Sequence, residues 1–238
     1  MKLDILVFAV HPDDAELGCS GTILKHIAAG KKVGIVDLTR GELGTRGTAD
    51  TRDEEAARSA EILGLHAREN LRMRDGFFKN DEEHQIRIIQ MLRKYRPEIV
   101  LSNALHDRHP DHGKAGDLVN DSMFLSGLSK VITHLDGEEQ AAWRPGLILQ
   151  YVQDRYIEPD ILIDVTEFWD KKMEAIHAFS TQFFNPENDD QGTYISSPEF
   201  LKVIDARARE LGKYIGATYA EGFTSRKYLG VDNLFQLR

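Results

Sequence analysis

The sequence predicts an α/β fold around a mostly parallel sheet, and three observations carry this prediction. Short apolar runs alternate with amphipathic helical segments through the first two thirds of the chain, which is typical of βαβ units. The 238 residues are 41% hydrophobic and 29% charged, a balance that supports a sizeable core. No internal repeat longer than a tripeptide and no low-complexity segment divides the chain, so we expect one domain over residues 1–238.

Up to residue 97 the pattern indicates three strands, each followed by a helix. The first strand is an unbroken apolar run, and Pro97 ends the third helix. Thr51 and Glu54 fit a capping box at the start of the second helix. The expected order is strand 5–10, helix 18–30, strand 33–38, helix 51–63, short strand 70–73 and helix 81–95.

The second half continues the alternation and then changes character. We expect a strand over 99–101, a helix from beyond His112 to Leu125, and strands over 146–152 and 161–165. A polar loop over 185–192 precedes a long amphipathic helix over 197–215.

Composition excludes several classes of partner. The net charge of −9 argues against nucleic acid, because proteins that bind it display concentrated basic surface. Cys19 is the only cysteine, so no intramolecular disulfide can form and a reducing compartment is expected. The apolar stretch near Met1 is too short for a signal-peptide core or a membrane span. We therefore expect a cytoplasmic protein with no membrane or nucleic-acid partner.

A tripeptide that occurs twice is the strongest functional signal. His11-Pro12-Asp13 continues to Asp14 after the first strand, and His109-Pro110-Asp111 continues to His112 after the strand over 99–101. The carboxyl ends of parallel strands meet at one edge of a sheet, where such folds bind their ligands. Imidazoles and carboxylates that converge there predict a mononuclear metal site with a general base beside it.

The histidines and aspartates of the two extended tripeptides have expected roles. His11, Asp14 and His112 can hold the metal, which leaves Asp13 free to take a proton from its water. His109 is then a nearby imidazole that stabilises an oxyanion, with Asp111 as its orienting carboxylate. Two histidines and one carboxylate fit both Zn²⁺ and the Fe²⁺ of non-haem oxygenases, so the ligand set alone does not choose between them. The additional Asp13 favours hydrolysis, which makes Zn²⁺ the expected metal and Fe²⁺ the alternative.

Three other interpretations fit the sequence less well. A single His-Pro-Asp is usually a turn that caps a helix, but two copies, each with a further ligand-type residue, favour function. Dinucleotide binding would need a Gly-x-Gly-x-x-Gly turn after the first strand, and carboxylates stand there instead. A serine hydrolase would need a Gly-x-Ser-x-Gly elbow, which the sequence lacks.

Beyond the tripeptides, the motifs resemble a known family. The stretches are 9–21 around the first tripeptide, the Thr39 to Thr45 loop, Arg52-x-x-Glu55-Ala56 and the second tripeptide with His112. Together they resemble the PIG-L type, LmbE-like zinc-dependent deacetylases of N-acetylglucosamine conjugates. The resemblance implies a Rossmann-like three-layer sandwich with the active site at the carboxyl edge of the strands. It also implies that the part from about residue 145 completes the sheet and the substrate cleft.

The resemblance also carries site roles, position by position. His11, Asp14 and His112 would hold the metal, with Asp13 as the base and His109 as the oxyanion stabiliser. Arg52 and Asp75 match positions that contact sugar hydroxyls, and Glu42 of the glycine-rich loop joins the substrate-binding set. One position departs from some relatives, which have a tyrosine that can assist the oxyanion where this chain has Asp107. If a tyrosine takes that role here, Tyr194 is the candidate.

Within the family, the second half most resembles the N-acetylglucosaminyl malate deacetylases of bacillithiol biosynthesis. Arg108 and Tyr194 would then bind the acidic malate aglycone, since guanidinium grips carboxylates bidentately. A structural salt bridge of Arg108 with Asp107 or Asp111 is the alternative. Relatives in this subgroup imply a homo-oligomer, specifically a hexamer. The alternatives in function are another N-acetylglucosamine conjugate or a chito-oligosaccharide as substrate, and a metal- or sugar-binding protein without turnover.

Overall fold

The computed structural model describes residues 1–185 and 192–237, and one seven-stranded sheet organises them. The strand order is β3-β2-β1-β4-β7-β9-β8, and β9 runs antiparallel to its two neighbours while the other pairs are parallel. The strands are β1 (Ile5–Ala9), β2 (Val33–Asp37), β3 (Ala67–Asn70), β4 (Ile99–Ser102), β7 (Leu147–Tyr151), β8 (Ile161–Asp164) and β9 (Ala220–Thr224). This confirms the predicted fold class.

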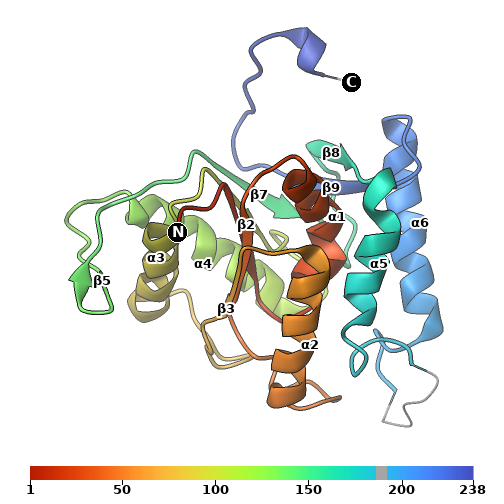
Figure 1. Ribbon diagram of the computed structural model, residues 1–238, viewed down its shortest axis with the longest axis horizontal. Helices are drawn as coiled ribbons and strands as arrows, with labels where there is room; N and C mark the ends of the chain where they lie inside the picture. The colour runs from red at the N-terminus through yellow and green to blue at the C-terminus, as the bar shows by residue number, and fades with distance from the viewer. Residues whose placement is uncertain (186–191, 238) are drawn as a thin grey trace.

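Helices cover both faces of the sheet and complete three layers. Figure 1 shows α3 and α4 on one side and α1, α2, α5 and α6 on the other. The helices are α1 (Asp14–Ala28), α2 (Ala49–Leu63), α3 (Glu82–Tyr95), α4 (Pro110–Ser126), α5 (Trp169–His177) and α6 (Pro198–Tyr214). Among the described residues, no helix is both long and apolar enough to cross a membrane.

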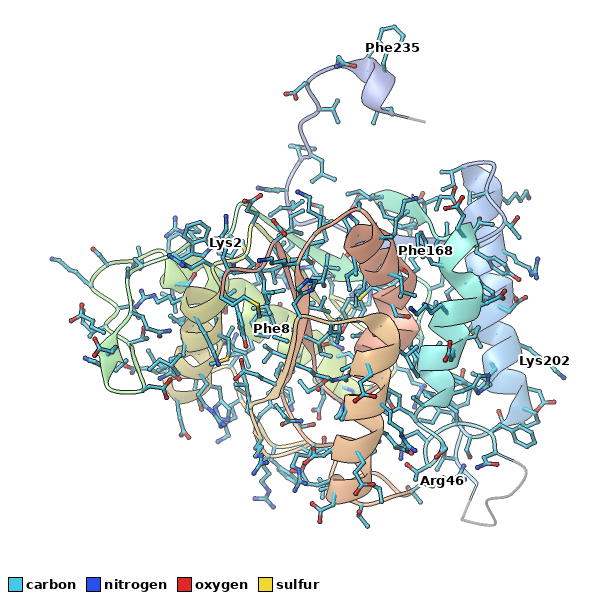
Figure 2. The ribbon with its side chains drawn as sticks, in the orientation of Figure 1. Lys2, Phe8, Arg46, Phe168, Lys202 and Phe235 are labelled. Atoms are coloured by element: carbon cyan, nitrogen blue, oxygen red, sulfur yellow. The ribbon has the colours of Figure 1, made fainter. Side chains whose placement is uncertain are left out.

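Two cores lie against the two faces of β1, because side chains alternate along a strand. Leu6 and Phe8 pack toward α3 and α4, whereas Ile5 and Val7 pack toward α1. Phe8, labelled at the centre of Figure 2, is fully buried. A strand buried on both faces reads as an unbroken apolar run, which explains why β1 was predictable.

Two local predictions were wrong. The short strand expected at 70–73 ends at Asn70, because the left-handed φ of 50° at Arg72 breaks the extended backbone. The capping box expected from Thr51 and Glu54 is formed instead by Thr48 and Thr51, so α2 begins earlier. The strand and the helix start therefore both lie about three residues earlier in the chain than predicted.

The strands after residue 145 join the same sheet as the earlier ones. The sequence pattern does not predict β9, which lies between β7 and β8, or helix α5. It also does not predict the short hairpin of β5 (His134–Leu135) and β6 (Glu138–Glu139). The helix expected at 197–215 is confirmed as α6, with Ser197 as its N-cap. Apart from its two ends, the polar loop expected at 185–192 lies outside the described residues.

The chain leaves the body after β9. Figures 1 and 2 show this C-terminal segment extending away from the layers, with Phe235 near its end. Phe235 is 99% exposed.

Candidate metal centre and active site

The two tripeptides meet at the carboxyl edge of the sheet, between β1 and β4. These strands are neighbours, paired in parallel from Ile5 with Ile99 onward. From β1 the chain turns toward β2 on one side, and β4 lies on the other, so the crevice is a topological switch point. The rings of His11 and His109 lie 4.9 Å apart, and those of His109 and His112 lie 5.2 Å apart.

Asp14, the first residue of α1, contacts both other proposed metal ligands. Its Oδ2 accepts the His11 backbone N–H at 2.9 Å and lies 3.5 Å from His11 Nδ1, while its Oδ1 lies 3.1 Å from His112 Nε2. Asn103 Nδ2 donates to Oδ2 at 3.1 Å, and Gln153 Nε2 donates to Oδ1 at 3.0 Å. The two amides hold the carboxylate between the imidazoles.

Asp107 orients His112 from the other side. Asp107 Oδ2 lies 2.6 Å from His112 Nδ1, and the same carboxylate accepts the backbone N–H groups of Asp154 and Arg155. A histidine that donates one ring N–H to a carboxylate presents its other nitrogen to a metal. His112 therefore directs Nε2 toward Asp14.

The sequence motifs do not mark Asn103, Gln153 or Asp107 as supports of the proposed metal ligands. Asn103 follows β4 directly, Gln153 follows β7 closely, and Asp107 lies in the loop after β4. Their position beyond the carboxyl ends of apolar strands was the available signal, because that edge holds the tripeptides.

Asp13 adopts a backbone conformation that residues with a Cβ rarely occupy. Its φ is 141°, and its side chain does not cap α1. Instead Arg52 Nη2 donates to Asp13 Oδ2 at 3.1 Å and to the Pro12 carbonyl oxygen. Such strain costs on the order of 1–3 kcal/mol and concentrates at functional positions. The turn therefore directs Asp13 away from the helix and toward the guanidinium.

His109 caps α4 with its ring. His109 Nδ1 accepts the Asp111 backbone N–H at 3.3 Å, and Pro110 occupies the first turn of the helix. The Asp111 carboxylate, expected to orient His109, instead accepts N–H groups from Gly76 at 2.9 Å and from Lys114 at 2.7 Å. The neutral ring of His109 thus carries its proton on Nε2, because Nδ1 is occupied as an acceptor.

Asp75 connects the glycine-rich loop to the site. Its Oδ1 lies 3.0 Å from His11 Nε2, and its Oδ2 accepts the Leu43 backbone N–H at 3.1 Å. Glu42 Oε1 accepts the Asp75 backbone N–H at 2.8 Å. Glu42 therefore positions Asp75, and its own side chain lies outside the cavity described below.

The donor set fits a divalent metal. Among the described residues, ligand atoms of His11, His109 and His112 lie within 4.8 Å of one another, as do those of His11, Asp75 and Asp111. Asp14 contacts two members of the first group. Imidazole nitrogen with carboxylate oxygen suits Zn²⁺ or Fe²⁺.

In the protein without a metal, protonated histidines balance the negative charge of the neighbouring carboxylates. Burial opposes protonation of His11, but hydrogen bonds and charges from Asp14 and Asp75 outweigh it and raise the pKa to about 10. For His112, the charge of Asp14 and the bond to Asp107 outweigh burial and raise the pKa to about 9. A divalent ion would displace these protons, so the pocket's demand for positive charge fits a metal.

The two remaining groups have shifts suited to acid–base work. Burial raises the pKa of Asp13 to about 7, although the neighbouring Arg52 charge opposes the rise. Burial and the charges of His11 and His112 lower the pKa of His109. Near neutral pH the site therefore combines a carboxyl group poised to exchange a proton with a neutral imidazole donor.

A cavity of about 320 Å³ opens at this centre. It brings together most of the residues proposed from the sequence: His11, Asp13, Asp14, Arg52, Asp75, Arg108, His109 and His112 line it, whereas Glu42, Asp111 and Tyr194 do not.

Arg108 and Tyr194 form a cluster at the rim around Asp154. Arg108 Nε donates to Asp154 Oδ2 at 2.6 Å, and Tyr194 Oη donates to Asp154 Oδ1 at 3.0 Å. The Arg108 guanidinium lies 4.7 Å from the centre of the Tyr194 ring. The salt bridge of Arg108 is therefore with Asp154, not with Asp107 or Asp111. Arg207 donates to the Asp154 carbonyl oxygen and also lines the cavity.

Comparison with known proteins places this geometry in context. Residues 6–123 match the PIG-L family model, described as GlcNAc-PI de-N-acetylase. Diacetylchitobiose deacetylase of Thermococcus kodakarensis is 31% identical over 92% of this chain and 81% of that protein. The solved structure of the conserved protein TT1542 from Thermus thermophilus has a TM-score of 0.84 at 37% identity, covering 97% of this chain and 98% of that one.

Two further relatives bear on the subgroup. A probable N-acetyl-α-D-glucosaminyl L-malate deacetylase 2 of Bacillus anthracis is 26% identical over 75% of this chain and 81% of that protein. The 4-oxalmesaconate hydratase of Pseudomonas putida is 29% identical over 74% of this chain and 73% of that protein. The resemblance drawn from the motifs is thus confirmed at the level of the family, and the chain belongs to the PIG-L family of deacetylases.

Proposed function

We propose that this protein is a metal-dependent deacetylase that hydrolyses the acetamide group of an N-acetylglucosamine conjugate. The observation that carries the proposal is the position of Asp14 between His11 and His112, with Asp13 and His109 lining the same cavity. His11, Asp14 and His112 would hold the ion, and Zn²⁺ is the ion we propose, with Fe²⁺ as the alternative.

Asp13 handles the proton in this proposal. A bound divalent ion would supply an activated water and polarise the acetamide carbonyl. The Asp13 carboxylate accepts a proton as the water attacks and returns it to the departing amine. Its contact with Arg52 fixes the carboxylate and favours its ionised form.

His109 stabilises the developing charge on the carbonyl oxygen. Its Nδ1 accepts a backbone N–H, which leaves Nε2–H as the donor that can approach an oxyanion. Its lowered pKa keeps the imidazole neutral, so His109 acts as an uncharged hydrogen-bond donor.

The proposed sugar and aglycone contacts come from opposite sides of β1 in the sheet, since Asp75 follows β3 and Arg108 follows β4. Arg52 and Asp75 line the wall beside the glycine-rich loop, where sugar hydroxyls would bind. Arg108 and Arg207 also line the cavity, and among the described residues the one carboxylate that pairs with either of them is Asp154, through Arg108. This surplus of one positive charge supports an acidic aglycone. We propose the malate glycoside of bacillithiol biosynthesis as the substrate and a diacetylated chito-oligosaccharide as its rival.

Acetate release tests the proposal. Purified protein loaded with Zn²⁺ or Fe²⁺ is given N-acetylglucosaminyl malate, diacetylchitobiose and free N-acetylglucosamine. We expect acetate from the malate glycoside with the highest kcat/KM, and loss of that preference in Arg108→Ala. A higher kcat/KM on diacetylchitobiose would favour the rival. Absence of acetate from all three would refute deacetylation.

A further inference from the structure

The wall of the cavity also includes apolar residues outside the polar centre, and we call the part that they line the apolar branch. Six residues define this branch: Leu17 and Gly18 of α1, Ile204, Ala208 and Leu211 of α6, and Ala220 of β9. Gly18, Ala208, Leu211 and Ala220 are buried. The proposed deacetylation does not use this space.

The branch adjoins the proposed metal centre. Leu17 and Gly18 follow Asp14 by three and four residues, so they lie on the same face of α1 as this proposed ligand. On α6, Ile204 and Ala208 lie on one face, and Leu211 continues it. The helical rise from Ile204 to Leu211 is about 10 Å, which is much longer than the methyl group of an acetamide needs.

The cavity wall also contains one charged pair, Lys172 and Glu221, whose polar groups bond within the protein. Lys172 Nζ lies 2.6 Å from Glu221 Oε1 and donates to the Leu17 carbonyl oxygen at 2.8 Å. The Glu221 carboxylate also accepts the backbone N–H groups of Gly21 and Thr22 at 2.9 and 2.7 Å. Both charged groups are therefore paired within the protein, so they do not require a polar ligand in this part of the cavity.

The direction of the branch identifies which part of the substrate enters it. Arg52 and Asp75, which can bind sugar hydroxyls, line the wall beside Gly41 and Gly44. The branch is formed by α1, α6 and β9, and in the sheet β9 lies on the other side of β1 from β2 and β3, which lead into the glycine-rich loop and Asp75. An amide has its sugar on one side of the reacting carbon and its acyl group on the other. A sugar held at the loop therefore directs the acyl group toward the branch.

We infer that the apolar branch is an acyl-chain subsite and that the enzyme hydrolyses N-acyl glucosamine conjugates with chains longer than acetyl. This inference rests on the proposed function, because it places the scissile amide at the same centre. In the reaction, water adds to the acyl carbon, the C–N bond breaks, the nitrogen takes a proton, and a fatty acid leaves in place of acetate.

The test compares N-acetyl-, N-butyryl- and N-hexanoyl-glucosamine with the metal-loaded enzyme, by release of the free amine. Burial of each methylene corresponds to a gain of about fourfold, so kcat/KM should rise by about 15-fold from acetyl to butyryl. Ala208→Leu should lower the ratio of hexanoyl to acetyl kcat/KM by at least about tenfold, and Ala208→Val serves if that variant does not fold. Ala206→Leu, on the exposed side of α6, is the matched control and should keep the ratio.

The outcomes separate the two proposals. If neither these substrates nor N-acetylglucosaminyl malate releases amine, the proposed function fails. If acetyl is cleaved but longer chains are cleaved no faster, the acyl subsite alone is overturned. A hexyl glycoside of N-acetylglucosamine forms the last arm. A gain there, with none for N-hexanoyl-glucosamine, would assign the branch to the aglycone and overturn the inference.

Discussion

Replacing Asp13 by Asn should make the enzyme slower and the metal-free protein more stable. Asn keeps the size of the side chain but cannot accept a proton, so kcat should fall by about 10²–10⁴-fold. Asp13 is 5% exposed, and its burial raises the pKa from 3.8 to about 7. The folded state therefore binds this proton more tightly than the unfolded state does.

The stability effect has a definite sign and pH range. Because the folded-state pKa is raised, Asp13 lowers the free energy of unfolding increasingly as pH rises from about 4 to about 7. At one pKa unit per 1.36 kcal/mol, the full penalty is about 4 kcal/mol above pH 7. Asp13→Asn lacks this penalty, so its gain in stability should be about 2 kcal/mol larger at pH 8.5 than at pH 5.5.

Urea unfolding of the metal-free protein at these two pH values measures the difference, and metal analysis accompanies the kinetics. Glu54→Gln, on the exposed surface of α2, removes a carboxylate without such burial and is the control. If the gain in stability of Asp13→Asn does not grow with pH, burial does not raise the pKa of Asp13 as argued. A near-normal kcat with the metal bound would refute the role of Asp13 as base.

Three further predictions concern the groups around Asp13. Arg52→Gln removes the positive charge that opposes the raised pKa of Asp13, so the acidic limb of the pH profile of kcat/KM should move to higher pH; an unchanged limb would contradict the coupling. His112→Ala should lose the metal, whereas His109→Ala should keep it and lose kcat; metal content and turnover measured together distinguish the two, and equal metal loss would make His109 a ligand. Asp107→Asn should weaken metal affinity by about 10–100-fold because His112 loses its orienting carboxylate, and titration with a competing chelator measures this; unchanged affinity would dismiss the role of Asp107.

The sequence predicted the parts of the fold that depend on local pattern. β1 could be found because both of its faces are buried, which makes the run uniformly apolar. β9 was not predicted because Glu221 and Gly222 interrupt its apolar pattern. Its place between β7 and β8 is set by tertiary pairing. β3 has a polar sequence, and its half-buried Arg68 forms ion pairs with Glu16 and Asp37.

The candidate site was predictable where its residues adjoin in the chain. His11, Asp13 and Asp14 share one turn, so their convergence followed from the position of β1 alone. The neighbours that position them are distant: Gln153 reaches Asp14 across 139 residues, and Arg52 reaches Asp13 across 39. No periodicity in one sequence encodes such pairs.

Anomalous diffraction from crystals grown with Zn²⁺ tests the central claim most directly. The account predicts one strong peak coordinated by His11, Asp14 and His112, with Asp13 beside it and not bound. A peak held by His11, Asp75 and Asp111 would contradict the assignment of the ligands and of the base together.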